Sequence, residues 1–143
     1  MLAGWLAAVW VICVAATEAS AEFDPEKMDH YVDVVLTEAA SEGPRGQIAV
    51  AEVLRNRGWN TAGFCGLRRK NLRGFLRAEA GQRVRARRAI RAALAGSNFS
   101  RGATHYENVL KFGKPKWASR MAVTTRLGRH TFYTGRTGRC KAA

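Results

Sequence analysis

Two acids stand at a break between two apolar-periodic segments. Glu38 closes the first segment, Glu42 follows it, and a Gly43-Pro44 step comes before the second segment. A carboxyl group at such a junction can be partly desolvated by the core while its oxygens face a cleft, which suits a general acid. Glu38 is therefore a candidate proton donor, and the alternative that the residues alone leave open is a solvent-facing side chain of the helix. Glu42 is either a second carboxylate for the same reaction or an acid that stabilises the start of the next helix.

The elements that must position these acids follow from apolar periodicity and breaker residues. We expect helices over residues 25–40, 44–57 and 82–95, and an ambiguous, short helical segment within 67–80. After Gly96 the helical pattern lapses, and residues 102–106 and 130–133 are predicted to be extended. The pattern indicates an α+β, mainly α, single domain whose C-terminal part is a small β or irregular unit.

The residues around the two acids resemble a known motif. From Glu38 the chain reads Glu-Ala-Ala-Ser-Glu-Gly-Pro-Arg-Gly-Gln-Ile-Ala-Val-Ala. This matches, with identical spacing, the Glu-Ala-x-x-Glu-x-x-x-Gly-Gln-x-Ala-Val-Ala motif of spore-cortex-lytic-enzyme-like cell wall hydrolases. Further blocks follow in the family's order, at Val53–Arg57, Gly102–Tyr106, Pro115–Trp117 and Gly128–Tyr133. After Cys65-Gly66 only Phe75 matches, so the substrate subsites on that side are expected to differ.

The resemblance implies a lysozyme-like or lytic-transglycosylase-like fold that cleaves peptidoglycan between N-acetylmuramic acid and N-acetylglucosamine, without a cofactor. It makes Glu38 the catalytic acid. Glu38 would protonate the leaving glycosidic oxygen and then accept the proton of the sugar's own 6-hydroxyl, which gives a 1,6-anhydromuramoyl end. A hydrolase would need a second carboxylate, about 5–5.5 Å away if retaining and about 6.5–9.5 Å away if inverting. Glu42 is the candidate for that role.

The same blocks suggest residues that bind the sugar chain. Flat aromatic side chains stack on sugar faces, although they also serve as ordinary core residues, and polar side chains bind hydroxyl groups. The candidates are Gln47, Asn56, Thr104, His105, Tyr106, Trp117, His130 and Tyr133. Glu52 replaces a residue that is usually small and apolar in the family, and we expect it at the surface.

The N-terminal segment differs from the rest of the chain. An apolar stretch over residues 2–16 is followed by Ala19-Ser20-Ala21, a small-x-small site. Residues 1–21 are therefore predicted to be a signal peptide, cleaved from a catalytic domain over 22–143. An uncleaved membrane anchor is the alternative, but the run is short for a bilayer, which needs about 20 apolar residues. We expect an exported monomer, in the periplasm or in the extracellular space and cell wall, with no stable membrane span after cleavage.

The positions of the cysteines and histidines bear on two further possibilities, a disulfide and a zinc site. Cys13 lies in the predicted signal peptide, and the pair Cys65 and Cys140 favours a disulfide in an exported domain. A zinc-dependent peptidoglycan amidase or peptidase, with His105, His130 and an acid as ligands, is an alternative enzyme. The chain has no His-Glu-x-x-His pattern. No metal is therefore predicted.

The chain is strongly basic, with 24 Lys and Arg against 11 Asp and Glu and a formal net charge of +13. Such a field favours polyanions. Because an export signal is predicted, the polyanionic cell wall is the expected partner, and nucleic acid is not. A non-catalytic basic protein that binds nucleic acid or envelope polyanions is the alternative from another class.

Activity on purified cell wall should fall as salt rises from a low value to about 0.3 M, because added salt screens the attraction between the basic surface and the wall. Turbidity clearance of wall suspensions would measure this dependence. A flat salt profile would contradict the role assigned to the charge.

Overall fold

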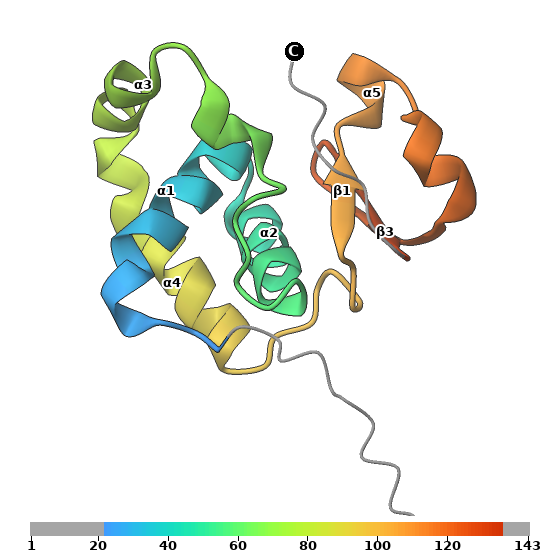
Figure 1. Ribbon diagram of the computed structural model, residues 1–143, viewed down its shortest axis with the longest axis horizontal. Coiled ribbons are helices and arrows are strands. Elements are labelled where there is room, and N and C mark those ends of the chain that lie inside the picture. Colours follow the sequence, from blue (N-terminus) through green and yellow to red (C-terminus); the bar gives the residue numbers. More distant parts are fainter. Residues whose placement is uncertain (1–21, 136–143) are drawn as a thin grey trace, which may run out of the picture.

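The computed structural model describes residues 22–135 (Figure 1). The helices α1 (Met28–Ala39), α2 (Pro44–Asn56), α3 (Leu72–Ala78) and α4 (Arg83–Leu94) come first in the chain. They are followed by β1 (His105–Glu107), α5 (Val109–Phe112), β2 (Ala122–Leu127) and β3 (His130–Thr134). The predicted α+β, mainly α class is confirmed. The predicted signal peptide and Cys140 lie outside the described residues.

The first two helices begin where the sequence marks a start. The Asp24 carboxylate accepts a hydrogen bond from the Glu26 N–H at 3.0 Å, and Pro25 opens the short 3-10 turn Pro25–Lys27 that leads into α1. Pro44 occupies the first position of α2. The helices predicted over 25–40 and 44–57 are thus confirmed within about three residues. None of the helices within residues 22–135 is long and apolar enough to cross a membrane.

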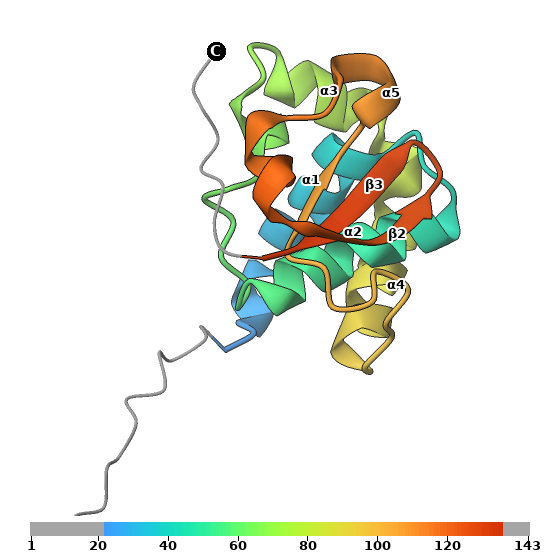
Figure 2. The same ribbon diagram turned by 90° about the vertical axis from the view of Figure 1, so that its right-hand side faces the viewer.

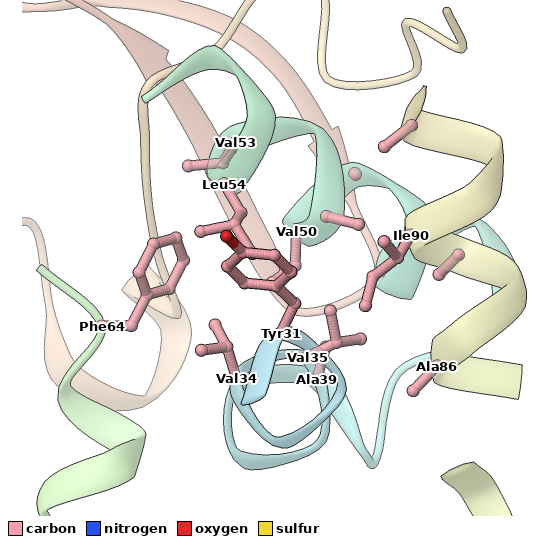
Figure 3. Close-up of a cluster of buried hydrophobic side chains, with 14 of the residues drawn as sticks. Tyr31, Val34, Val35, Ala39, Val50, Val53, Leu54, Phe64, Ala86 and Ile90 are labelled. Atoms are coloured by element: carbon pink, nitrogen blue, oxygen red, sulfur yellow. The ribbon is translucent and has the colours of Figure 1, made fainter. Parts of the chain in front are cut away.

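The helices pack around one hydrophobic core (Figure 3). Most of its members are buried side chains of α1, α2 and α4, among them Val34, Val35, Val50, Val53, Leu54, Ala86 and Ile90. The side of α4 that enters this core carries mainly alanines, so its backbone can approach α2 closely. Exposed arginines of α4, such as Arg88 and Arg91, account for much of the basic composition of this segment.

The three strands form an antiparallel sheet with the order β1-β3-β2. The sheet lies along one side of the helical core (Figures 1 and 2). Tyr106 pairs with Phe132, and Phe132 belongs to the hydrophobic core. Because side chains alternate along a strand, His105 and its pairing partner Tyr133 lie on the opposite face. The register therefore decides which candidate residues can reach the helices.

The sequence did not predict β2 and α5. Strand β2 lacks a clean apolar alternation, and it joins β3 through a turn in which Gly128 has a φ of 56°. A register shift between Val123 and Thr125 interrupts the alternation further. The segment therefore becomes a strand through its pairing with β3 and not through its own pattern.

Glu52 is buried, and the expectation that it lies at the surface is wrong. Its Oε1 accepts a hydrogen bond from the Phe99 N–H at 2.9 Å, and its Oε2 accepts one from the Ser100 N–H at 2.6 Å. A buried carboxylate is tolerated when donors satisfy its oxygens. Glu52 thereby fastens the loop between α4 and β1 to the middle of α2.

Replacing Glu52 with Gln should lower the free energy of unfolding by about 2–4 kcal/mol, because an amide turns one acceptor into a donor that faces a buried N–H. Urea denaturation would measure the loss. Glu26→Gln, at an exposed acid of the N-terminal turn, is the matched control. Equal stability of the two variants would show that the two hydrogen bonds are not needed.

Candidate active site

Glu38 lies in the last turn of α1, and two other segments of the chain bind its carboxyl group. Its Oε1 accepts a hydrogen bond from the Gly66 N–H at 2.6 Å, and its Oε2 accepts one from the Tyr106 hydroxyl at 2.7 Å. Gly66 belongs to the loop after α2, and Tyr106 belongs to β1. The half-buried side chain is thus held in one orientation by a helix, a loop and the sheet.

The loop can reach Glu38 only because residue 66 is glycine. A Cβ at this position would lie 2.6 Å from Thr37 Cβ and 2.9 Å from Glu38 Oε1. Both distances are shorter than real side chains tolerate, so any larger residue would push the N–H away from the carboxylate. Position 66 therefore requires glycine for a steric reason that the sequence alone does not reveal.

Tyr106 is set up to remain a hydrogen-bond donor. Burial, and then the neighbouring Glu38 carboxylate, raise the pKa of Tyr106 well above its ordinary value. The positive charge of Arg57 acts against this rise and lowers the pKa of Tyr106. The Cζ atom of Arg57 lies 5.0 Å from the centre of the Phe64 ring. The Tyr106 hydroxyl therefore keeps its proton at neutral pH and donates a hydrogen bond to Glu38.

A cavity of about 180 Å³ opens beside Glu38. Its walls come from the end of α1, from α3 and from the segments around it, and include Thr37, Ser41, Arg69, Phe75, Glu79 and Gln82. Glu79 is a second carboxylate in this cavity, and its Oε2 accepts a hydrogen bond from Gln82 Nε2 at 2.6 Å. No role is predicted for Glu79 from the sequence, because no residue near it along the chain indicates chemistry.

Glu42 is not part of the cavity wall. It is only 6% exposed, its Oε2 accepts a hydrogen bond from the Arg129 N–H at 3.2 Å, and its Oε1 lies 3.9 Å from His130 Nδ1. A Cβ on Gly128 would come within 1.9 Å of Glu42 Oε2. Glu42 therefore joins the break between α1 and α2 to the turn between β2 and β3.

The sheet separates the aromatic and histidine candidates into two groups. The His130 ring lies 4.9 Å from the Tyr106 ring, on the face that meets Glu38. On the other face, Trp117 lies 5.4 Å from the His105 ring and 5.4 Å from the Tyr133 ring. The structure thus brings Tyr106 and His130 to Glu38 and places His105, Trp117 and Tyr133 away from it.

The three remaining candidates bind other parts of the protein. Gln47 is fully buried, and its Nε2 donates to the Ala39 carbonyl at 3.2 Å and to Gln82 Oε1 at 3.3 Å. Asn56 Nδ2 donates to the Ala103 carbonyl at 2.8 Å. Thr104 Oγ1 donates to the Gly135 carbonyl at 3.1 Å. At each of these positions the polar side chain makes a hydrogen bond within the protein, which favours a polar residue there.

The described residues also bear on metal and disulfide chemistry. Within residues 22–135, no three His, Cys, Asp or Glu side chains lie close enough together to share a metal ion. His105 and His130, the ligands of the zinc alternative, lie on opposite faces of the sheet. Cys65 is disulfide-bonded, and its predicted partner Cys140 lies outside the described residues, so that pairing stays a prediction.

A comparison with protein families decides the identity of the domain. The model of the family described as Cell Wall Hydrolase matches residues 41–133, which is more than half of the chain. The chain belongs to the cell wall hydrolase family. The match begins after Glu38, so the role of Glu38 in this hydrolase rests on the site's geometry and on the motif resemblance. The resemblance to spore-cortex-lytic-enzyme-like proteins is confirmed.

A solved structure shows the same fold as this hydrolase. The catalytic domain of the Bacillus cereus SleB protein superposes with a TM-score of 0.58 and 22% sequence identity. The similarity covers 83% of this chain and 99% of the SleB domain. A search of the curated proteins finds no match. The SleB likeness therefore establishes the fold of the described domain.

Acid should destabilise this hydrolase through His130. Burial lowers the pKa of His130 by more than Glu42 and Glu38 raise it. Below the unfolded pKa of about 6.5, the unfolded chain binds a proton that the folded protein does not, so stability falls as pH drops.

His130→Asn should flatten the loss of stability between about pH 7 and pH 5, because the variant has no imidazole to charge at this buried position. Urea denaturation at each pH measures the slope, with the exposed His30→Asn as the control. An unchanged slope in His130→Asn would assign the acid sensitivity to other groups.

Proposed function

We propose that this cell wall hydrolase cleaves the glycan strand of peptidoglycan between N-acetylmuramic acid and N-acetylglucosamine, and that it does so as a lytic transglycosylase. Family membership supports the wall as substrate. The observation that carries the mechanism is the Glu38 carboxyl group, held by Gly66 and Tyr106 beside a cavity. With the predicted signal peptide, this assigns the enzyme to the cell wall or periplasm, where we expect it to act as a monomer.

In the first step Glu38 acts as an acid. It gives its proton to the glycosidic oxygen, the bond between that oxygen and C1 of the muramic acid breaks, and C1 acquires oxocarbenium character. The negative charge left on Glu38 is then stabilised by the Gly66 N–H and the Tyr106 hydroxyl. Hydrogen bonds to a charged acceptor are roughly twice as strong as neutral ones, so both donors favour the state after proton transfer over the state before it.

In the second step Glu38 acts as a base. The 6-hydroxyl oxygen of the same muramic acid attacks C1, and the Glu38 carboxylate takes its proton. A bond between C1 and O6 closes the 1,6-anhydro ring, no water is consumed, and Glu38 returns to its protonated form. This route needs one carboxylate from the protein. Glu42, the carboxylate considered first for a second role, is buried and bound to the Arg129 N–H.

Hydrolysis is the second candidate, and one observation favours it. Glu79 lines the same cavity as Glu38, where a carboxylate could activate a water molecule for attack on C1. The hydrogen bond from Gln82 Nε2 would orient the Glu79 carboxylate for that task. In this case the product would carry a reducing-end muramic acid, and removal of the Glu79 carboxylate would abolish turnover.

Mass spectrometry of the muropeptides released from purified peptidoglycan tests these candidates. Wild type should release anhydromuramoyl products, and Glu38→Gln should release them about 10²–10⁴-fold more slowly because the acid is lost. Glu26→Gln, at an exposed acid far from the cavity along the chain, should match wild type.

Other products would redirect the proposal. Reducing-end muramic acid, lost in Glu79→Gln, would show a hydrolase. Cleaved stem peptides would contradict glycan cleavage and favour an amidase or peptidase. Wall binding without any product, unaffected by Glu38→Gln, would show a non-catalytic binding protein.

A further inference from the structure

The face of the sheet that is turned away from Glu38 carries a second hollow. It has a volume of about 370 Å³ and is lined by α5, by β2 and β3, and by the segments that connect them. The lining residues used below are Leu110, Lys114, Val123, Arg126 and Arg129, with Tyr133 beside them. The hollow shares no lining residue with the cavity beside Glu38. The proposed reaction therefore leaves this surface without a role.

The charge of the hollow has one sign. Its charged lining residues are Lys114, Arg126 and Arg129, and no Asp or Glu lines it. The ion pairs between described residues involve other Lys and Arg side chains, while His130, which also lines the hollow, lies 3.9 Å from Glu42 Oε1. No acid follows Glu107 in the sequence, so the C-terminal part of the chain adds positive charge only. A concave surface with one sign of charge concentrates ligands of the opposite sign.

Two exposed apolar side chains, Leu110 and Val123, line the hollow with these cations, and Phe112, at the end of α5, is exposed outside its lining. Leu110 is 91% exposed and Phe112 is 68% exposed, both on α5, and Val123 on β2 is 48% exposed. Lys111 lies between the two α5 residues in the sequence, and Lys114 follows them. Exposed apolar residues gathered in one region mark a binding surface more often than scattered ones do. Apolar side chains bordered by Lys and Arg are typical of surfaces that rest in a membrane interface.

The two observations together select the ligand. Anionic wall polymers would satisfy the cations but offer no apolar phase for Leu110 and Phe112. An anionic lipid surface supplies both, since its phosphates bind cations and the boundary of its acyl chains takes up apolar side chains. We propose that this face binds the surface of an anionic membrane, with Lys114, Arg126 and Arg129 at the lipid phosphates and Leu110 and Phe112 in the acyl boundary.

Binding in this way leaves the cavity beside Glu38 accessible. Glu38 meets the sheet on the face of Tyr106, whereas Val123 and Tyr133, which border the hollow, pair with each other on the opposite face. The protein could therefore rest on a membrane through one face of the sheet and act on the wall from the helical side. The proposal does not depend on which glycan product the enzyme makes.

Depth-dependent quenching on the full chain tests whether α5 enters the lipid. Leu110→Trp places a fluorophore at the proposed contact, and Val84→Trp places one at a 62% exposed position of α4. Any membrane contact of the rest of the chain is common to both variants. Vesicles of brominated phosphatidylglycerol serve as the quencher. The increase in quenching over wild type should be at least about threefold larger for Leu110→Trp than for Val84→Trp. Equal quenching of the two variants would overturn the proposal.

Affinity measurements separate lipid from wall polymer as the partner. Leu110→Ser with Phe112→Ser, and separately Lys114→Gln with Arg126→Gln, should each weaken co-sedimentation with phosphatidylglycerol vesicles by about tenfold or more. Val84→Ser and the pair Arg73→Gln with Arg88→Gln, all at exposed positions on α3 and α4, are the matched controls.

Binding of the Leu110 and Phe112 variant to lipid-free peptidoglycan should equal that of wild type. If binding to the lipid-free wall falls as far as binding to vesicles, the surface binds the wall and the membrane proposal is wrong. Neither readout uses turnover, so failure of this proposal and failure of glycan cleavage are distinguishable.

Discussion

The Glu38 carboxyl group is the point at which the fold and the proposed chemistry meet. It accepts one hydrogen bond from a loop, at the Gly66 N–H, and one from the sheet, at the Tyr106 hydroxyl. An acid on a helix surface would rotate freely in solvent, whereas these two donors fix its orientation. The close approach of the loop requires a glycine, and the reach of the tyrosine requires the register of β1 on β3.

Two further carboxylates join the helical part to the C-terminal part in a similar way. Glu42 accepts a hydrogen bond from the Arg129 N–H in the turn between β2 and β3, and Glu52 accepts two from the loop before β1. In each case an acid of the segment from α1 to α2 binds backbone N–H groups of a segment distant in sequence. The sheet has few apolar residues of its own in the core, so these polar contacts set its position relative to Glu38.

The sequence predicted the helices because their apolar periodicity is a local property. It also singled out Glu38 as the catalytic acid and Tyr106 as a sugar-binding residue, through the motif that contains the acid and the block that contains the tyrosine, and both roles stay predictions. It placed Glu52 at the surface, since nothing local shows that two distant N–H groups would cover a carboxylate. It could not separate Tyr106 from Trp117 and Tyr133, because strand register and a β-bulge decide which face each occupies. Glu79 lines the cavity only because of how the segment after α3 packs. No pattern in the neighbouring sequence indicates that packing.

The central claim is that Tyr106 holds Glu38 in the orientation needed for proton transfer. The most direct measurement is turnover of purified peptidoglycan by Tyr106→Phe, with wall binding and thermal stability measured alongside. Tyr133→Phe is the matched control, because it removes the same hydroxyl group from the other face of the sheet. Tyr106→Phe should lose turnover by about tenfold or more while wall binding is retained, and Tyr133→Phe should keep its turnover. Equal turnover of the two variants would contradict this role of Tyr106.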